Sequence, residues 1–266
     1  MKRTFVVAEF GVTHDGQYAQ AVRLIQAAAQ AGADAAKGQF WSDSKRLADR
    51  RNAPELAERL EPYRMPENWL KPLMLIAAQA GIEFMCTVYI PEDIPTVAGL
   101  VQRMKIASLE AQDLAFVRAH RATGKQTLIS TGCCDEAALG RLQELKDQYF
   151  GQWDVRLLLC TSAYPAPLQD VNLRAIRTYD LDGFSDHTPS RLTGALAVAA
   201  GARIVEKHLR LEETNPANPD FPHSLPPEEF REYVAHIRST EEALGDGRKR
   251  IQASEAAMQR YVVRGR

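Results

Sequence analysis

The sequence predicts a single (β/α)8 barrel, and three observations support this fold class. Short apolar runs alternate with stretches of helical periodicity along almost the whole chain, as in a parallel sheet covered by helices. Eight such units fit within about 250 residues, a length typical of a closed barrel. The first run ends in Glu-Phe-Gly-Val-Thr-His-Asp-Gly (9–16), which is not the glycine-rich dinucleotide turn of an open doubly wound sheet. We therefore expect residues 1–250 to form one barrel and residues 251–266 to form a C-terminal tail.

The apolar runs give the eight expected strands. They occupy 5–10, 34–40, 83–89, 103–109, 126–131, 155–162, 183–187 and 203–208. The helical stretches are clearest at 18–31, 68–80, 135–148, 191–200 and 227–244. Gly32, Gly81, Gly124 and Gly201 follow helical stretches, where a residue without Cβ adopts the left-handed conformation that ends a helix.

Two segments interrupt this alternation. Residues 41–65 are highly charged and are expected to form an active-site loop with a short helix. Arg50 and Arg51 in this loop either reach a substrate or are solvated. Residues 212–225 are rich in Pro and Asn, follow the eighth strand, and are expected to form a lid or wall of the site.

The composition excludes some classes of partner. Of 266 residues, 33 are Lys or Arg and 34 are Asp or Glu, so no overall positive field attracts nucleic acid or a membrane surface. No apolar stretch has the length of a signal peptide or of a membrane span. Cys86, Cys133, Cys134 and Cys160 show no C-x-x-C spacing, and we expect reduced thiols in a cytoplasmic protein.

The active site of such a barrel lies at the C-terminal ends of its strands, and every expected strand ends in polar residues. Lys37 and Lys105 stand there together with the hydroxyl groups of Thr87, Ser108, Ser130 and Ser185. These donors suit a small, multiply charged anion such as a phosphate or a carboxylate. Lys207 points away from them and is expected to be structural. A lysine that forms a Schiff base remains an alternative.

His187 and His208 end consecutive strands, so their rings are expected to converge at the mouth of the barrel. Two imidazoles with open positions suit a first-row metal such as Mn²⁺, Zn²⁺ or Fe²⁺. Glu206 lies two residues before His208 on the same side of its strand, where it can orient a ligand or act on a proton. Cys160 is expected to be a small core residue, and His14 belongs either to the site or to a turn.

Eight segments together resemble one known family. They are Val-Ala-Glu-Phe-Gly-Val-Thr-His-Asp-Gly (7–16), Gly-Ala-Asp-Ala-Ala-Lys-Gly-Gln-Phe (32–40), Met-Lys-Ile-Ala-Ser-Leu-Glu (104–110), Ile-Ser-Thr-Gly (129–132), Cys-Thr-Ser-Ala-Tyr-Pro-Ala-Pro (160–167), Asp-Val-Asn-Leu-Arg-Ala-Ile (170–176), Phe-Ser-Asp-His-Thr (184–188) and Val-Glu-Lys-His (205–208). In this order they resemble the sialic acid synthase (N-acetylneuraminate synthase, NeuB-like) family.

The resemblance implies a metal-dependent condensation of phosphoenolpyruvate with an aldehyde sugar, N-acetylmannosamine or a related N-acyl hexosamine. The products would be a nonulosonic (sialic-type) acid and phosphate. The metal would polarise the aldehyde oxygen. Mn²⁺ is the expected ion, with Mg²⁺, Co²⁺ and Zn²⁺ as alternatives.

The resemblance also assigns roles to residues of this sequence. His187 and His208 would bind the metal, and Gln39 and Tyr164 would contact the sugar. Glu9, Glu110 and Asp220, with Glu206 from its position, would handle water and protons. The phosphoenolpyruvate site would comprise Lys37, Thr87, Lys105, Ser108, Ser130, Ser162 and Ser185.

The sequence departs from the family pattern at several points. Thr13 replaces the usual Asn, Gly38 replaces an aromatic residue, and Ser162 stands where relatives often have Asn. The chain also reaches Arg266 near the expected start of a C-terminal antifreeze-like domain. The resemblance implies a homodimer, and the sequence leaves open whether a separate antifreeze-like domain protein is a further partner.

Two other functions remain open from the sequence. One is a phosphoenolpyruvate-dependent synthase that acts on a different aldehyde, as do the related synthases for erythrose or arabinose phosphates. The other is a catalytically silent barrel that acts as a binding subunit.

Overall fold

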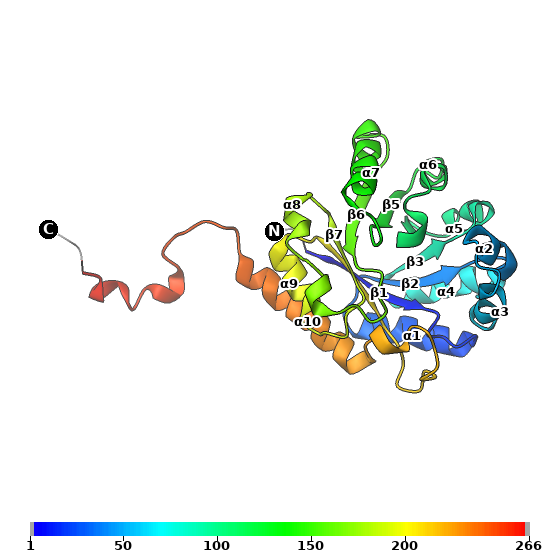
Figure 1. Ribbon diagram of the computed structural model, residues 1–266. Coiled ribbons are helices and arrows are strands. Elements are labelled where there is room, and N and C mark those ends of the chain that lie inside the picture. The colour runs from blue at the N-terminus through cyan, green and yellow to red at the C-terminus, as the bar shows by residue number, and fades with distance from the viewer. Residues whose placement is uncertain (1–2, 264–266) are drawn as a thin grey trace.

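The computed structural model describes residues 3–263, whose eight strands close into the predicted parallel barrel (Figure 1). Each strand pairs with the next one in the chain, and the eighth pairs with the first. Residue pairs such as Glu9 with Lys37 and Thr87 with Lys105 stand side by side in this register. The strands are β1 (Phe5–Gly11), β2 (Ala35–Phe40), β3 (Glu83–Val88), β4 (Arg103–Ile106), β5 (Gln126–Ser130), β6 (Val155–Cys160), β7 (Gly183–Asp186) and β8 (Ile204–His208).

The helices cover the outside of the barrel (Figure 1). They are α1 (Tyr18–Gln30), α2 (Ser44–Arg50), α3 (Leu56–Leu60), α4 (Glu67–Gln79), α5 (Ile94–Ala98), α6 (Leu114–Arg121), α7 (Glu136–Gln148), α8 (Ala175–Thr178), α9 (Thr193–Ala200) and α10 (Pro227–Leu244). The five helices expected from the sequence are confirmed to within two residues at their ends. The four glycines expected at helix ends all have positive φ, from +65° at Gly124 to +117° at Gly201.

Two strands are shorter than expected by more than one residue. β4 ends at Ile106 because Ser108–Glu110 form a 3-10 turn, so Ser108 and Glu110 lie on that turn and not on the strand. β6 ends at Cys160, and Thr161 and Ser162 lie in the irregular segment that follows it. The charged segment 41–65 contains two short helices, α2 and α3, where one was expected.

The barrel interior is layered. Val7, Ala35, Met85, Leu128, Leu158 and Ile204 form an apolar cluster inside the barrel, separate from the larger core between the strands and the helices. Because successive strand residues alternate sides, the residues two positions further on also point inward. Five of them are polar, namely Glu9, Lys37, Thr87, Ser130 and Glu206. The apolar cluster therefore forms the floor under a polar layer that lies toward the C-terminal ends of the strands.

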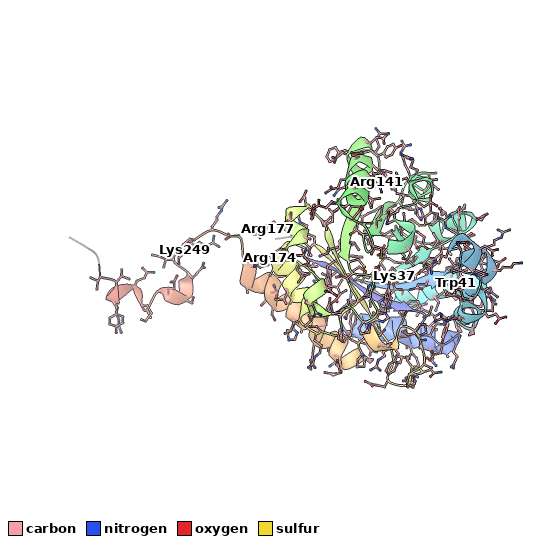
Figure 2. The ribbon with its side chains drawn as sticks, viewed as in Figure 1. Lys37, Trp41, Arg141, Arg174, Arg177 and Lys249 are labelled. Carbon is pink, nitrogen blue, oxygen red and sulfur yellow. The ribbon has the colours of Figure 1, made fainter. Side chains whose placement is uncertain are left out.

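Charged side chains also lie outside the barrel interior, on the outer helices and on the C-terminal segment. Figure 2 shows Lys37 within the barrel, Arg141 on α7 at its periphery, and Lys249 on the segment that follows α10. Residues 251–263 form two 3-10 turns, are exposed, and extend away from the barrel (Figure 1). Positions 264–266 of the expected tail lie outside the described residues. Between residues 3 and 263, no helix is both long and apolar enough to cross a membrane.

Candidate active site

A cavity of about 220 Å³ opens at the C-terminal ends of the strands and collects nearly all the predicted site residues. Only Ser162 and Glu110 of the predicted set do not line it. The predicted residues on its wall are Glu9, Lys37, Gln39, Thr87, Lys105, Ser108, Ser130, Tyr164, Ser185, His187, Glu206, His208 and Asp220.

Four charged residues, each at most 3% exposed, form the deepest part of the site: Glu9, Lys37, Lys105 and Glu206. Lys37 Nζ forms an ion pair with Glu9 and lies 3.5 Å from Glu206 Oε2. Lys105 Nζ lies 3.7 Å from Glu206 Oε1. Negative and positive charges therefore alternate in the order Glu9, Lys37, Glu206 and Lys105. The attraction between neighbouring charges offsets the cost of burying them.

The lysines differ in how completely they are neutralised. Burial acts to lower the pKa of Lys37, but Glu206 and Glu9 outweigh it and hold that pKa above its usual value. Burial lowers the pKa of Lys105, and Glu206 offsets only part of this effect. Burial likewise opposes ionisation of Glu206, yet Lys105 and Lys37 lower its pKa to about 2. Lys105 is therefore the lysine that a bound anion would stabilise most.

The predicted hydroxyl groups fall into two sets. Those of Thr87 and Ser185 are already engaged, since Lys37 Nζ donates to Thr87 Oγ1 at 2.8 Å and Ser185 Oγ donates to Glu206 Oε1 at 2.9 Å. Ser130 Oγ and Ser162 Oγ are buried and have no partner within the described residues. Of these two hydroxyls, that of Ser130 lines the cavity and is available to a ligand there.

Gly132 lies next to both Ser108 and Ser162. Its N–H donates to Ser108 Oγ at 3.1 Å, and a Cβ on Gly132 would overlap Ser162 Oγ. Ser162 therefore lies just behind the cavity wall, beside Ser108, although it does not line the cavity. A glycine at this position keeps the hydroxyls and the backbone N–H close together.

His187 and His208 converge as the sequence predicted, with ring centroids 5.5 Å apart. His187 Nδ1 lies 2.9 Å from the carbonyl oxygen of Thr161, which can only accept, so Nδ1 carries the proton and Nε2 keeps its lone pair. His208 Nδ1 lies 3.3 Å from Asp220 Oδ2, an arrangement that favours the same tautomer. Cys160 is buried as predicted, and its Sγ lies 3.6 Å from His187 Nδ1.

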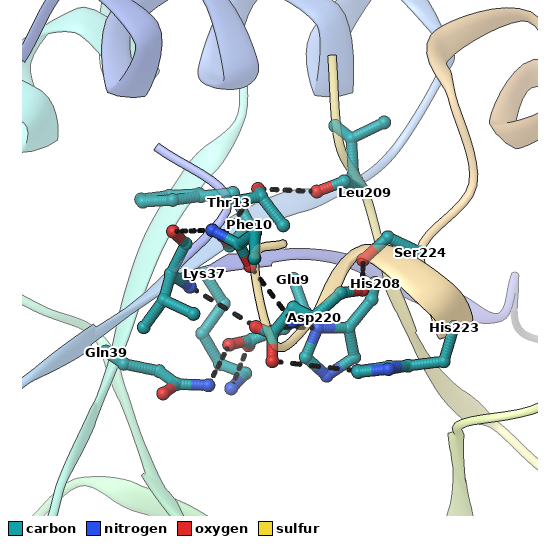
Figure 3. A network of polar contacts seen from close by, with 12 residues as sticks. Glu9, Phe10, Thr13, Lys37, Gln39, His208, Leu209, Asp220, His223 and Ser224 are labelled. Atoms are coloured by element: carbon teal, nitrogen blue, oxygen red, sulfur yellow. Dashed lines mark hydrogen bonds and ion pairs between the residues drawn. The ribbon is translucent and has the colours of Figure 1, made fainter. Parts of the chain in front are cut away.

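Asp220 comes from the segment 212–225, which forms one wall of the site (Figure 3). Asn218 fixes this segment to the loop after β1, because its amide donates to the Val12 carbonyl at 2.9 Å and to Asp15 at 2.7 Å. Burial opposes ionisation of Asp220, but His208 outweighs it and holds the pKa of this carboxyl well below its usual range. The prediction of a lid or wall is therefore confirmed as a wall.

His223 is a site residue that the sequence interpretation missed. It lies on the 3-10 turn Phe221–His223, with its ring centroid 4.4 Å from that of His208 and 5.7 Å from that of His187. Ligand atoms of His208, Asp220 and His223 lie within 4.8 Å of one another. Burial and the neighbouring His208 lower the pKa of His223 to about 2, so its ring is neutral. The sequence offers only one indication of this role. His223 follows Asp220 by three residues, within a segment that was expected to adjoin the site.

The segment 41–65 contributes Arg51 to the cavity wall, and contact of Arg51 with a substrate stays a prediction. Its guanidinium donates to Glu110 Oε1 at 2.8 Å and 3.2 Å, and it also lies over the ring of Tyr89. Glu110 is buried behind Arg51 and does not line the cavity. Its predicted role in proton handling stays a prediction.

Three other residues take structural roles. Lys207 points outward and contacts Asp186 and the Thr188 carbonyl, as predicted. His14 is buried, and its Nδ1 accepts the N–H of Gly16 at 3.0 Å, so it belongs to the turn after β1. Thr13, at the position where Asn was expected, contacts the carbonyl oxygens of Phe10 and Leu209 through its hydroxyl, each at 2.8 Å.

The model of the NeuB family matches residues 24–249, which include seven of the eight strands and most of the cavity wall. The chain belongs to the NeuB family. This confirms the resemblance that the eight sequence segments indicated.

Relatives within the NeuB family are sialic-type acid synthases. The chain is 37% identical to an N,N'-diacetyllegionaminic acid synthase of Legionella pneumophila, over 98% of this chain and 78% of that protein. It is 34% identical to a pseudaminic acid synthase of Campylobacter jejuni, over 98% of this chain and 80% of that protein. The crystal structure of an N-acetylneuraminic acid (sialic acid) synthetase from Leptospira borgpetersenii superposes with a TM-score of 0.86 at 27% identity, covering 98% of this chain and 91% of that one.

Proposed function

We propose that this protein condenses phosphoenolpyruvate with the open-chain aldehyde of N-acetylmannosamine or a related N-acyl hexosamine, in the presence of a divalent metal ion. The products are a nonulosonic acid and inorganic phosphate. The observation that carries this proposal is the placement of the buried Lys105 and the unpartnered hydroxyls of Ser130 and Ser162 in the same barrel as the converging rings of His187 and His208. The names of the relatives support the same class of reaction.

The donor set fits a divalent metal ion. The free lone pair of His187 Nε2 faces the site because Nδ1 is held by Thr161, and His208 Nδ1 faces the Asp220 carboxylate at 3.3 Å. When bound, the ion supplies Lewis acidity that polarises the aldehyde oxygen of the acceptor. Mn²⁺ is the ion we propose to test first, followed by Mg²⁺, Co²⁺ and Zn²⁺.

Phosphoenolpyruvate carries a phosphate and a carboxylate, and the site offers cations and hydroxyls for both. Lys105 lacks full neutralisation by Glu206, Ser108 and Ser162 lie beside the backbone of Gly132, and Ser130 lines the same cavity as Lys105. Charge-assisted hydrogen bonds from these groups suit an anion of this size. Lys37 is already paired with Glu9 and Glu206, so its contribution to binding is mainly to keep those carboxylates away from the ligand.

The reaction balances as follows. C3 of phosphoenolpyruvate attacks the aldehyde carbon, which forms a carbon–carbon bond and leaves positive charge at C2. The aldehyde oxygen takes up a proton, and water adds to C2 and loses a proton, which leaves a hydroxyl group on C2. The C2–O bond to phosphate then breaks, the hydroxyl proton passes to the departing phosphate, and C2 becomes the keto carbon. Glu206 and Glu9 are the carboxylates nearest the lysines, and burial raises the pKa of Glu9. Glu9 is therefore suited to accept the proton from water and to return it.

The sugar would occupy the outer part of the cavity. Gln39 and Tyr164 line its wall, and Gln39 Nε2 already donates to Glu9 Oε1 at 3.0 Å. Arg51 lies on the same wall and adds a cation whose contact with a substrate the sequence left open. These groups offer hydrogen bonds to sugar hydroxyl and N-acyl groups.

The proposal is tested by phosphate release from phosphoenolpyruvate with each of the four metal ions. The acceptors are mono- and di-N-acetylated hexosamines, plain hexoses, and erythrose and arabinose phosphates. We expect release only with the N-acetylated sugars. Phosphoenolpyruvate with ¹⁸O in the bridging oxygen should give labelled phosphate, because the carbon–oxygen bond breaks. Labelled oxygen retained in the sugar acid would contradict this chemistry.

Two other outcomes would assign a different function. Release with another aldehyde would retain the phosphoenolpyruvate chemistry and change the acceptor. Absence of both release and phosphoenolpyruvate binding, in protein shown to be folded, would favour the silent barrel.

A further inference from the structure

We infer that His223 is a third imidazole ligand of the metal ion, together with His187 and His208, and that the site therefore prefers Zn²⁺, Co²⁺ or Fe²⁺ to Mn²⁺. The inference rests on the proposed function in one respect, the presence of a divalent metal. It goes beyond that proposal because neither the sequence interpretation nor the two-histidine site includes His223.

The spacing of the three rings is the first observation. Their centroids are 4.4 Å apart for His208 and His223, 5.5 Å for His187 and His208, and 5.7 Å for His187 and His223. A metal–nitrogen bond of about 2.1 Å puts a ring centroid roughly 3.2 Å from the ion, so two ligand rings stand about 4.5 Å apart at a right angle and about 5.2 Å apart at a tetrahedral angle. The observed separations of the three rings lie within about 0.5 Å of this range.

The second observation is that His223 has no other partner. The residue is 1% exposed, and neither ring nitrogen has a hydrogen-bond partner in the part of the chain that the structure describes. The nearest carboxylate oxygen, Asp220 Oδ1, lies 3.7 Å from His223 Nε2, which is too long for a hydrogen bond. By contrast, His120 and His14, the other buried histidines outside the cavity, each use one nitrogen in a backbone hydrogen bond. A buried imidazole with both nitrogens unused is costly unless a ligand satisfies it.

The third observation is that the fold fixes His223 beside His208. The backbone N–H of Leu225 donates to the His208 carbonyl at 3.0 Å, and Leu209 and Leu225 form an isolated bridge. Ser224 Oγ donates to the Asp220 carbonyl at 2.5 Å, which closes the turn that carries His223. The two histidines are therefore held by one backbone connection, as preorganised ligands require.

Asp220 lies between His208 and His223 (Figure 3), and the group of ligand atoms within 4.8 Å of one another comprises these three residues and not His187. Its Oδ2 faces His208 Nδ1 and its Oδ1 faces His223 Nε2. The 3.3 Å contact allows this carboxylate to orient His208 as an imidazole ligand and to raise its basicity, whereas the 3.7 Å separation leaves His223 without a hydrogen bond.

The chemistry of the donors sets the expected preference. Two imidazoles with open positions for water and substrate oxygen suit Mn²⁺, whereas a third imidazole increases affinity for Fe²⁺, Co²⁺ and Zn²⁺ more than for Mn²⁺. Removal of His223 should therefore weaken Zn²⁺ binding more than Mn²⁺ binding. A residue that acted only on packing would weaken both alike.

The test measures the affinities of the full chain for Zn²⁺ and Mn²⁺ by competition with a chromophoric chelator, in the wild type, His223→Ala and His223→Gln. The matched control is His120→Gln, another fully buried histidine that lies on α6. We expect His223→Ala to lower Zn²⁺ affinity by about 100-fold or more, beyond the loss of about 10- to 100-fold that follows removal of an outer-shell partner. We expect a smaller loss for Mn²⁺, and wild-type affinities in His120→Gln.

X-ray absorption of the Zn²⁺-loaded protein counts the coordinated imidazoles directly and needs no turnover. Three in the wild type and two in His223→Ala support the inference, and circular dichroism checks that each variant is folded. Two imidazoles in the wild type would overturn it, even if His223→Ala weakened binding, because His223 would then act only by positioning Asp220. Unchanged Zn²⁺ affinity in both His223 variants would also overturn it. Failure of the wild type to bind any divalent ion would reject the proposed metal-dependent function as well.

Discussion

Gly11 and Asp220 lie so close together that a methyl group on Gly11 would overlap a carboxylate oxygen of Asp220. Gly11 ends β1 with φ of +43°, and the register with β2 shifts between Glu9 and Gly11. This bulge opens the space into which Asp220 reaches from the far end of the chain. The position of Asp220, in the segment after the eighth strand, therefore depends on the backbone conformation at Gly11, at the end of the first strand.

Gly11→Ala should disrupt this arrangement. The left-handed backbone costs a residue with Cβ roughly 1–2 kcal/mol, and the displaced Asp220 would no longer orient His208. We expect a lower free energy of unfolding in urea together with weaker Zn²⁺ binding. Gly140→Ala is the control, because an added Cβ there meets nothing within 4 Å on α7. That change should stabilise the protein by about 0.5–1 kcal/mol. Equal behaviour of the two variants would contradict the argument.

Lys105→Met tests the anion site. The methionine keeps most of the buried volume but removes the ammonium group, and a hydrogen bond to a charged group is worth about 1.5–3 kcal/mol. We therefore expect phosphoenolpyruvate to bind roughly 10- to 150-fold more weakly by calorimetry. Lys207→Met is the matched control, because Lys207 is also buried but contacts Asp186 outside the cavity. It should lose stability and keep its affinity. The same loss of affinity in both variants would remove Lys105 from the binding site.

His187→Ala should abolish metal-stimulated turnover and leave the protein folded. His187 is held by the Thr161 carbonyl at the cavity wall, so its loss removes a donor without opening the hydrophobic core. The measurements are phosphate release with and without added Mn²⁺, and a thermal unfolding curve. His236→Ala, a change on α10 outside the cavity, serves as the control. Full activity in a metal-stripped His187→Ala variant would refute the assignment of the metal to this histidine.

The fold and most of the site were predictable because both depend on local patterns. Alternation along a strand decides which side chain faces inward, so Glu9, Lys37 and Glu206 could be placed from their positions alone. The pairing of these groups with one another was not predictable. That Ser185 donates to Glu206 depends on the register of β7 against β8, which the sequence does not state.

Arg51 and His223 show where sequence reasoning stops. Both lie in irregular segments, where no periodicity relates sequence position to direction. Arg51 reaches the cavity because Glu110 lies behind it, and His223 lies beside His208 because Asn218 ties its segment to the loop after β1. Such contacts join residues far apart in the chain, and only the closed barrel brings them together.

Stability should fall in mild acid, and His120 should contribute to that fall. Burial lowers the pKa of His120 from 6.5 to about 4, while its Nδ1 contacts the Phe116 carbonyl. Because the folded pKa is lower than the unfolded one, the unfolded state takes up the proton first. The contribution of His120 is complete above pH 6.5 and is lost as the pH falls from 6.5 toward about 4.

The slope that one such group adds is at most about 1.4 kcal/mol per pH unit. We expect His120→Gln to show a shallower decline in the free energy of unfolding between pH 6.5 and pH 4. The check is urea unfolding at several pH values, followed by circular dichroism. An identical pH dependence in the variant and the wild type would show that His120 is not buried as a neutral ring.

Gly38 illustrates how the chain accommodates a departure from the family pattern. A Cβ on Gly38 would lie 2.7 Å from Phe10 and 2.9 Å from Met65, so these two side chains fill the space where an aromatic residue was expected. Gly38→Ala should destabilise the protein by about 1–3 kcal/mol through overpacking. Part of that loss should disappear when Met65 is also changed to Ala, with a coupling energy of about 0.5–3 kcal/mol in a double-mutant cycle. Gly99→Ala is the control, because an added Cβ there makes only ordinary contacts at 3.7 Å. Strictly additive effects of Gly38→Ala and Met65→Ala would show that Met65 does not occupy the space of the missing side chain.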